Sequence, residues 1–205
     1  MRIEQIPVSP FYQNCTLLRS GGEVIVVDPG EVNDELRAAV KGQNVTMVFN
    51  THCHIDHAGG NAEMVRLTGA PLVCHEAELP LLQFLEQQGR MFGVRCEPSP
   101  PPDRFVVEGD VIRVGDEELK VIFTPGHSPG HVALLGDGFI IGGDCLFAGS
   151  IGRTDLPGGD YATLLNTLRD KYLTLPDDTV VYNGHGPTTT IGRERRTNPF
   201  LVDLA

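Results

Sequence analysis

Residues 51–60 place three histidines within six positions, and this crowding constrains the fold more than any other stretch of the chain. The segment reads Thr-His-Cys-His-Ile-Asp-His-Ala-Gly-Gly, so His52 and His54 precede Asp56 and His57 follows it. Imidazoles this close repel one another when protonated, whereas a divalent cation makes each of them a useful lone-pair donor. Side chains two apart on an extended strand are separated by about 6.6 Å, too far for ligands about 2.1 Å from one zinc ion. We therefore predict a curled, metal-binding loop rather than a histidine-rich surface loop.

The size and charge of the chain limit its architecture and its partners. Its 205 residues, 40% of them hydrophobic, are enough for one large core, so we predict a single domain over residues 1–205. The formal net charge of −11 would repel a phosphate backbone, and the only basic cluster is Arg193, Arg195 and Arg196. We therefore expect no nucleic-acid partner and no salt-sensitive binding of RNA or DNA.

The cysteines and the hydrophobic pattern indicate a soluble, cytoplasmic protein. Five cysteines are an odd number and show no CxxC spacing, which favours free thiols in a reducing compartment over a disulfide framework. Residues 1–10 lack the basic and apolar regions of a signal peptide, and no apolar run approaches the 18 or so residues that span a bilayer. We expect no membrane partner. The cysteines are Cys15, Cys53, Cys74, Cys96 and Cys145.

Hydrophobic periodicity predicts strands before helices in each half of the chain. We expect helices capped by Asn33 and by Asp160, a helix over residues 61–67, and a helix from residue 80 to near Gly89. The proline-rich residues 97–103 cannot be regular structure and are either a plain crossover or a lid. The strands are expected over residues 15–19, 23–27, 45–49, 71–74, 105–107, 111–114, 119–123, 132–135, 139–141 and 180–182.

Four of these apolar strands each lead to a residue that can bind a metal. Residues 45–49 lead to His52, 119–123 to His127, 139–141 to Asp144, and 180–182 to His185. Strand ends that converge form a site, and the neighbouring glycines permit close backbone approach. Six nitrogen or carboxylate ligands plus one bridging carboxylate suit two metals about 3.5 to 4 Å apart, which share a water of lowered pKa. That water would be the nucleophile.

The motifs at residues 52–57, 124–127, 143–144 and 184–186 together resemble the metallo-β-lactamase superfamily. The resemblance covers nearly the whole chain and implies an α/β fold, a four-layer αββα sandwich with the metal site at one edge of its two sheets. It implies that Asp28 orients a histidine ligand, although an aspartate that starts a turn is an equal alternative. The implied ligands are His52, His54 and His127 for one metal, Asp56, His57 and His185 for the second, and Asp144 as the bridge.

Within this superfamily, residues 143–160, 184–187 and 198–201 are similar to the short bacterial glyoxalase II-like branch, which hydrolyses thioesters such as hydroxyacylglutathione. The chain ends soon after residue 198, so we expect no C-terminal glutathione-binding helical domain. The expected substrate is a small-molecule thioester, glutathione-derived or similar. A metal-bridging hydroxide would attack its carbonyl, and the thiolate would leave without a separate acid. Asp56, His57 and Asp144 are the residues to which we assign catalysis.

Two more residues are candidates near the site. His131 belongs to the family motif and is interpreted as a structural or orienting residue, while Arg153 either meets a substrate carboxylate or pairs internally with Asp155. The implied cofactors are two divalent ions, with zinc ahead of iron and manganese. The sequence leaves the oligomeric state open.

A rival enzyme class shares this fold. Persulfide dioxygenases would hold one iron with His52, His127 and Asp144, and Cys53 beside the ligands favours them. His131 and the Gly-His-Gly-Pro sequence at residues 184–187 favour the hydrolase. A metal-binding protein without catalysis is a third class, which would have no use for an open, carboxylate-bridged site.

Overall fold

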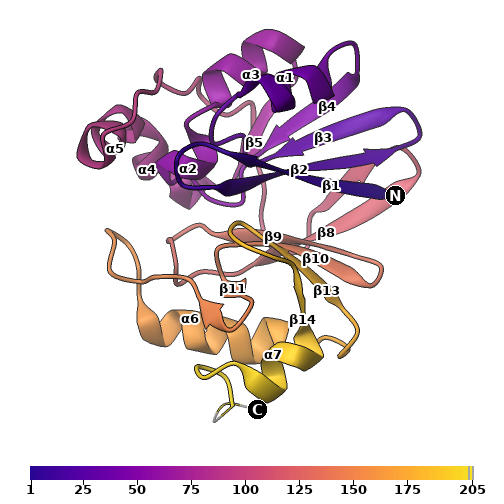
Figure 1. Ribbon diagram of the computed structural model, residues 1–205, viewed down its shortest axis with the longest axis vertical. Helices are drawn as coiled ribbons and strands as arrows, with labels where there is room; N and C mark the ends of the chain where they lie inside the picture. The colour runs from indigo at the N-terminus through magenta and orange to yellow at the C-terminus, as the bar shows by residue number, and fades with distance from the viewer. Residues whose placement is uncertain (203, 205) are drawn as a thin grey trace. The chain divides into compact units, whose positions relative to one another are not determined.

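The computed structural model describes residues 1–202 and 204, and these divide into two compact units. The first unit comprises residues 1–106 and 112–118, and the second comprises residues 107–111 and the described residues from 119 onward. Each unit is built on one β-sheet with helices packed against it (Figure 1). The boundary runs through β7 (Val111–Val114) and the first residues of β8 (Glu117–Phe123).

The sheet of the first unit places the loops after β3 and β4 at the same edge. Strands β1 to β3 pair antiparallel, whereas β3 to β6 pair parallel, so the carboxyl ends of β3, β4 and β5 point the same way. Asp28 follows β3 and His52 follows β4. In sheet order the strands are β1 (Arg2–Val8), β2 (Gln13–Ser20), β3 (Glu23–Val27), β4 (Asn44–Phe49), β5 (Leu72–Cys74) and β6 (Arg104–Phe105).

Two helices, α1 (Asp34–Val40) and α3 (Asn61–Thr68), cover one face of this sheet (Figure 1). The predicted cap is present, because Asn33 Oδ1 accepts the Leu36 N–H at 2.8 Å. Leu36 and Met64 are fully buried against Val26 and other strand residues, and each such side chain contributes about 1.5–3 kcal/mol. Apolar burial therefore fixes these helices on the sheet that carries the site.

The helix predicted from residue 80 to near Gly89 is wrong in its extent. The structure has a 3₁₀ turn, Glu76–Glu78, and then two helices, α4 (Leu79–Gln83) and α5 (Leu85–Phe92). Gly89 lies inside α5, where a Cβ would lie 2.8 Å from the Val94 carbonyl oxygen, so this glycine serves close packing. Helix α5 ends instead at Gly93, whose φ of 72° is the left-handed cap that glycine favours.

The sheet of the second unit brings three candidate ligands to one edge. Strand β8 is antiparallel to β9, β9 is antiparallel to β10, and β10 is parallel to β13, so β8, β10 and β13 run the same way. Their carboxyl ends lead to His127, Asp144 and His185. From one side the strands are β14 (Thr189–Thr190), β13 (Val180–Asn183), β10 (Phe139–Gly143), β9 (Val132–Gly136), β8 and β7.

A helical segment that begins at Tyr161 packs against this second sheet. Helix α6 (Tyr161–Thr167) continues as a π-type turn over Leu168–Tyr172, and the predicted Asp160 cap accepts the Thr163 N–H at 2.7 Å. Leu164, Leu168 and Tyr172 are buried in the apolar cluster of this unit, whereas Tyr161 at the start of the helix is exposed. The hairpin of β11 (Leu146–Phe147) and β12 (Ser150–Ile151), helix α2 (Ile55–Ala58) and helix α7 (Ile191–Thr197) complete the two units.

Two further findings concern the state of the cysteines and the length of the helices. All five cysteines are free thiols, as expected. Among residues 1–202 and 204, no helix combines the length and the apolar character needed to cross a membrane.

Candidate metal centre

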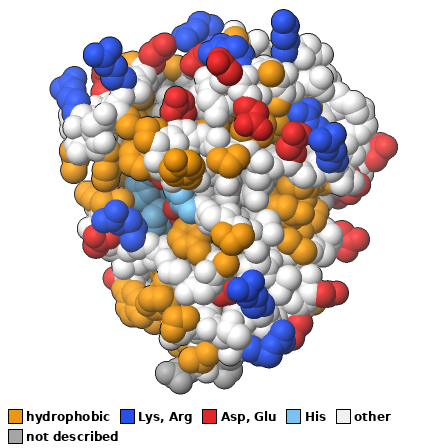
Figure 2. All heavy atoms as spheres, in the orientation of Figure 1, with side chains coloured by type: hydrophobic (Ala, Val, Ile, Leu, Met, Phe, Trp, Pro, Cys, Tyr) orange, Lys and Arg blue, Asp and Glu red, His pale blue; other side chains and the backbone are white. Residues whose placement is uncertain are grey.

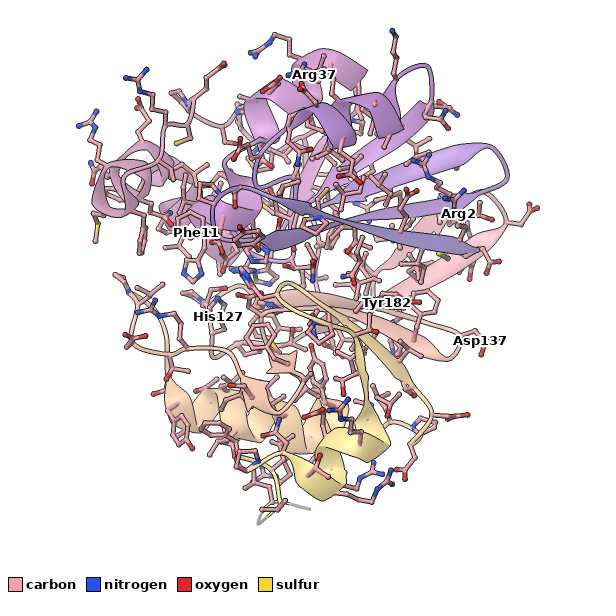
Figure 3. The ribbon with its side chains drawn as sticks, viewed as in Figure 1. Arg2, Phe11, Arg37, His127, Asp137 and Tyr182 are labelled. Atoms are coloured by element: carbon pink, nitrogen blue, oxygen red, sulfur yellow. The ribbon has the colours of Figure 1, made fainter. Side chains whose placement is uncertain are left out.

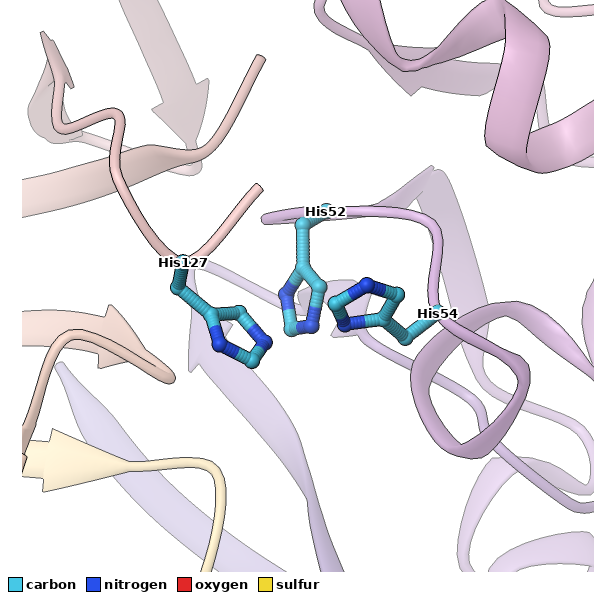
Figure 4. Close-up of side chains that lie close together, drawn as sticks. All are labelled: His52, His54 and His127. Atoms are coloured by element: carbon cyan, nitrogen blue, oxygen red, sulfur yellow. The ribbon is translucent and has the colours of Figure 1, made fainter. Parts of the chain in front are cut away.

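In the first unit, four predicted ligands lie on one short stretch of chain. His52 and His54 stand on the loop after β4 (Figure 4), and Asp56 and His57 belong to helix α2. The His52 ring centroid lies 4.8 Å from that of His54, at an interplanar angle of 88°, and 4.0 Å from that of His57. All three rings are buried. The loop therefore curls as the spacing predicted, with its imidazoles gathered together.

Asp28 sets the orientation of this loop. Its Oδ1 accepts the Thr51 N–H at 2.7 Å, and its Oδ2 accepts the Thr51 hydroxyl at 2.6 Å and the His57 Nδ1–H at 2.9 Å. Thr51 Oγ1 in turn lies 3.1 Å from His52 Nδ1. With Nδ1 engaged in both rings, Nε2 is the atom that each offers to a metal. Asp28 adopts φ of 54°, a left-handed conformation that a non-glycine residue keeps only when its surroundings enforce it.

In the second unit, Asp144 lies between two histidines. Asp144 Oδ2 is 3.7 Å from His127 Nε2 and 3.4 Å from His185 Nε2. His127, on the loop after β8, donates its Nδ1–H to the Arg153 carbonyl at 2.7 Å, so its Nε2 is also directed to the ligand position. The Asp144 side chain is 9% exposed and that of His185 is 29% exposed, which leaves this group open on the His185 side.

The separations of these atoms fit metal ligands. Two atoms bound to one tetrahedral zinc at about 2.0–2.2 Å lie about 3.4 Å from each other. Within the second unit the two distances to Asp144 are of this size, and within the first unit His57 Nε2 lies 3.8 Å from Asp56 Oδ2. All three exceed an ordinary N–H···O hydrogen bond. Imidazole and carboxylate ligands suit zinc, iron and manganese, so the donor set does not choose among them.

His131 holds the backbone of Asp144. Its Nδ1 pairs with Thr124 Oγ1 at 2.8 Å, and its Nε2 accepts the Asp144 N–H at 3.1 Å. Cys145 beside it donates its thiol to the Thr124 carbonyl at 3.3 Å, and burial raises the pKa of this thiol to about 12. Both ring nitrogens of His131 therefore contact the protein, and the residue orients a ligand.

Arg153 forms an internal ion pair. Its Nε and Nη2 contact the two carboxylate oxygens of Asp155 at 2.7 and 2.8 Å, and both side chains are exposed. These hydrogen bonds lower the pKa of Asp155 to about 2. The side chain stiffens the loop whose carbonyl orients His127, which is the internal alternative considered from the sequence.

The sequence Asn-Pro-Phe at residues 198–200 connects helix α7 to this loop. Asn198 Nδ2 donates to the Ser150 carbonyl at 3.0 Å and to Glu194 Oε2 at 2.9 Å, and the same Glu194 oxygen accepts the Gly149 N–H at 2.8 Å. The C-terminal helix therefore anchors the segment that runs on to Arg153.

Glycines allow close approach at two ligands. A Cβ on Gly30 would lie 1.6 Å from the Asp56 carbonyl oxygen, and a Cβ on Gly152 would lie 1.9 Å from the Asp144 carbonyl oxygen. No side chain fits at either position.

A cavity of about 310 Å³ lies in the first unit and reaches Asp56. Phe11 on the β1–β2 hairpin forms part of its wall (Figure 3) and contacts Phe92 edge to face, with centroids 6.0 Å apart. A small molecule in this cavity would lie beside a candidate ligand. Other lining residues are Glu31, Glu63, Arg95 and Cys96.

The structure reveals supporting residues that the sequence did not. Gln13 Nε2 lies 3.5 Å from His57 Nδ1, and the buried amides of Asn50 and Asn61 pair with each other while Asn50 also donates to the His57 carbonyl. Glu78 and Gln88 contact the loop backbone. Isolated polar residues of this kind carry no spacing signal, because their partners are distant in sequence.

A fold that gathers histidines and aspartates at the carboxyl ends of its strands is typical of a metal-binding protein, and the comparisons with known proteins give its family. Residues 8–185 match the family model of the metallo-β-lactamase superfamily, and the chain belongs to this superfamily. The predicted metallo-β-lactamase fold is thereby confirmed.

Three relatives show the range of the group. The chain is 36% identical to the hydroxyacylglutathione hydrolase GloC of Haemophilus influenzae, over 98% of both chains. It superimposes on the B3 metallo-β-lactamase BLEG-1 with a TM-score of 0.90 at 35% identity, covering 98% of this chain and 99% of that one. The di-iron-bound form of TTHA1623 gives a TM-score of 0.89 at 37% identity, over 97% and 100% of the two chains. Similar proteins therefore include one named as a hydroxyacylglutathione hydrolase, one named as a B3 metallo-β-lactamase and one whose structure is a di-iron-bound form.

Proposed function

We propose that the protein is a dinuclear, metal-dependent thioester hydrolase of the glyoxalase II type. The observation that carries the proposal is the pair of donor distances at Asp144, 3.7 Å to His127 Nε2 and 3.4 Å to His185 Nε2, which suit one carboxylate oxygen among metal-bound imidazoles. The full-length similarity to a hydroxyacylglutathione hydrolase supports the substrate class.

The ligand assignment follows the superfamily. In this proposal three histidines would hold the first ion, two histidines and an aspartate would hold the second, and one further aspartate would serve both. When bound, such ions lower the pKa of a water toward neutrality and polarise a carbonyl. The three sets are His52, His54 and His127; Asp56, His57 and His185; and Asp144.

The residues of the chain prepare the site for this chemistry. Asp28 fixes His57 through Nδ1, the Arg153 carbonyl fixes His127, and His131 fixes the Asp144 backbone, so little reorganisation is needed when metal binds. A thiolate is a good leaving group, so no residue is required as a general acid. We propose a glutathione-derived or similar small thioester as substrate, and a reducing, cytoplasmic location that suits five free thiols.

The charges give no support to a nucleic-acid partner. On the face in view in Figure 2, Lys and Arg side chains are interspersed with Asp and Glu side chains. With a net charge of −11, the surface offers few contacts that release counterions from a phosphate backbone, and the absence of RNA or DNA binding stays a prediction.

The thioester assay tests the function. Metal-loaded protein is expected to hydrolyse S-lactoylglutathione, and protein stripped by a chelator is expected to lose this activity and regain it when about two equivalents of metal return. A chromogenic cephalosporin serves as the comparison substrate, because one relative is a β-lactamase. Efficient β-lactam hydrolysis without thioester hydrolysis would reject the proposal.

The position of Cys53 does not support the persulfide dioxygenase alternative. This residue packs in an apolar cluster with Ile55, Cys74, Leu82 and Leu85, and it is fully buried. Burial raises the pKa of the Cys53 thiol well above its usual value. The di-iron-bound relative makes iron a metal to test, and the alternative is therefore kept as an arm of the experiments below.

A further inference from the structure

The metal-binding loop is held by side chains that act on the residues between its ligands. Thr51, Cys53 and Ile55 alternate with the candidate ligands His52, His54 and Asp56. Each of the three donates its backbone N–H to a side-chain oxygen from another part of the first unit. The acceptors are Asp28 Oδ1 at 2.7 Å, Glu78 Oε2 at 2.7 Å and Gln88 Oε1 at 3.0 Å, respectively.

Glu78 is a buried carboxylate with no part in the proposed chemistry. It ends the 3₁₀ turn after β5, and none of its surface is exposed. Burying a carboxylate costs free energy unless hydrogen bonds within the protein compensate for the lost hydration. The short contact with the Cys53 N–H is such a bond. The position of Glu78 is therefore explained by the loop that it supports.

Gln88 contacts the backbone on both sides of the candidate ligand His54. Its Oε1 accepts the Ile55 N–H, and its Nε2 donates to the Cys53 carbonyl at 3.3 Å and to the Leu81 carbonyl at 2.9 Å. The one amide thus joins helix α5, helix α4 and the backbone on both sides of His54. A side chain with both a donor and an acceptor is needed for this arrangement.

We infer that Glu78 and Gln88 are positioning residues that fix the His54 backbone in its metal-binding conformation before metal arrives. Residues 52–54 lie outside the helices and strands, and the His54 carbonyl accepts the first backbone bonds of helix α2. Glu78 and Gln88 satisfy the N–H groups on either side of His54, those of Cys53 and Ile55. Without them, metal binding would have to order the loop, and the affinity would fall by that cost. This inference rests on the metal-binding part of the proposed function and is independent of the substrate.

The test compares metal affinity in matched variants. Gln88→Leu and Glu78→Ala remove the acceptors, while Gln87→Leu and Glu76→Ala make the same changes at exposed neighbours. Zinc affinity is measured against a chromophoric chelator, and the visible spectrum of the Co²⁺-substituted protein reports the ligand geometry. Loss of such supporting partners typically costs about 10–100-fold in metal affinity. We expect a loss of this size with an altered cobalt spectrum in the first pair, and neither change in the second.

Two further outcomes separate positioning from general destabilisation. Glu78→Gln keeps an acceptor oxygen and should restore zinc affinity to within about threefold of the unmodified protein. Gln88→Leu changes a half-buried residue, so it remains testable if Glu78→Ala does not fold. A folded Gln88→Leu protein with unchanged zinc affinity and an unchanged cobalt spectrum would overturn the inference. Failure of thioester hydrolysis in the unmodified protein would reject the proposed function and leave these affinity differences intact.

Discussion

Replacing Asp144 with alanine is expected to abolish thioester hydrolysis and to remove most of the bound metal. Its carboxylate is the group proposed to serve both ions, and its Oδ2 lies within 3.7 Å of two candidate histidine ligands. We expect the rate to fall by at least about a thousandfold, a barrier increase of about 4 kcal/mol. Elemental analysis of the purified variant and its kcat with S-lactoylglutathione give the two readouts.

Asp137→Ala is the control for this variant. Asp137 is an exposed carboxylate at the β9–β10 turn (Figure 3), and its loss should leave both metal content and rate unchanged. A full complement of about two ions in Asp144→Ala would contradict the shared role of the carboxylate.

The variants His57→Ala and His185→Ala separate the two candidate enzymes. In a dinuclear hydrolase each removes a ligand of the second ion, so thioester hydrolysis should fall by about a hundredfold or more, which is about 2.7 kcal/mol. In a mononuclear iron dioxygenase neither residue would be a metal ligand. Persulfide-dependent oxygen uptake would then survive both changes within about tenfold. Oxygen uptake and thioester hydrolysis are therefore measured on the same preparations.

The two substitutions should differ in their effect on the stability of the protein. His57 is fully buried and donates to Asp28, so its loss leaves a buried carboxylate oxygen short of a donor and costs about 1–3 kcal/mol of stability. His185 is 29% exposed, so His185→Ala should keep nearly the unmodified melting temperature. His185 is therefore the cleaner test of the second ion. His75→Asn, which keeps a side-chain cap for the Ala77 N–H, is a histidine control outside the site.

The strand-end pattern predicted much of this arrangement. Apolar runs that lead to His52, His127, Asp144 and His185 are strands β4, β8, β10 and β13, and within the second unit the last three run the same way. Burial of the apolar runs fixes the strands, and parallel direction then brings their carboxyl ends to one edge. The apolar runs and the residues that follow them can therefore be recognised in a single sequence.

The residues that support the loop could not be predicted in this way. Glu78 and Gln88 lie among polar and helix-forming residues that are typical of a solvent-exposed surface, and their partners are 25 and 33 residues away along the chain. The division between α4 and α5 at Phe84 was missed for a related reason, because the apolar stripe runs through it. Tertiary contacts decide both features.

The two-residue strands β11, β12 and β14 were also not predicted. β11, β12 and β14 are too short to show an alternating pattern, and helix α7 carries three arginines on a mostly polar segment. Its position follows from Glu194 and Asn198, whose hydrogen bonds to the β11–β12 hairpin are long-range contacts.

The most direct test of a two-metal thioester hydrolase is a titration of metal-free protein with zinc or, under anaerobic conditions, with Fe²⁺. S-lactoylglutathione hydrolysis and persulfide-dependent oxygen uptake are followed at each addition. We expect hydrolysis to rise until about two equivalents are bound, with no persulfide-dependent oxygen uptake. Oxygen uptake that is complete at one equivalent of iron, with no thioester hydrolysis under either metal, would contradict the proposed function.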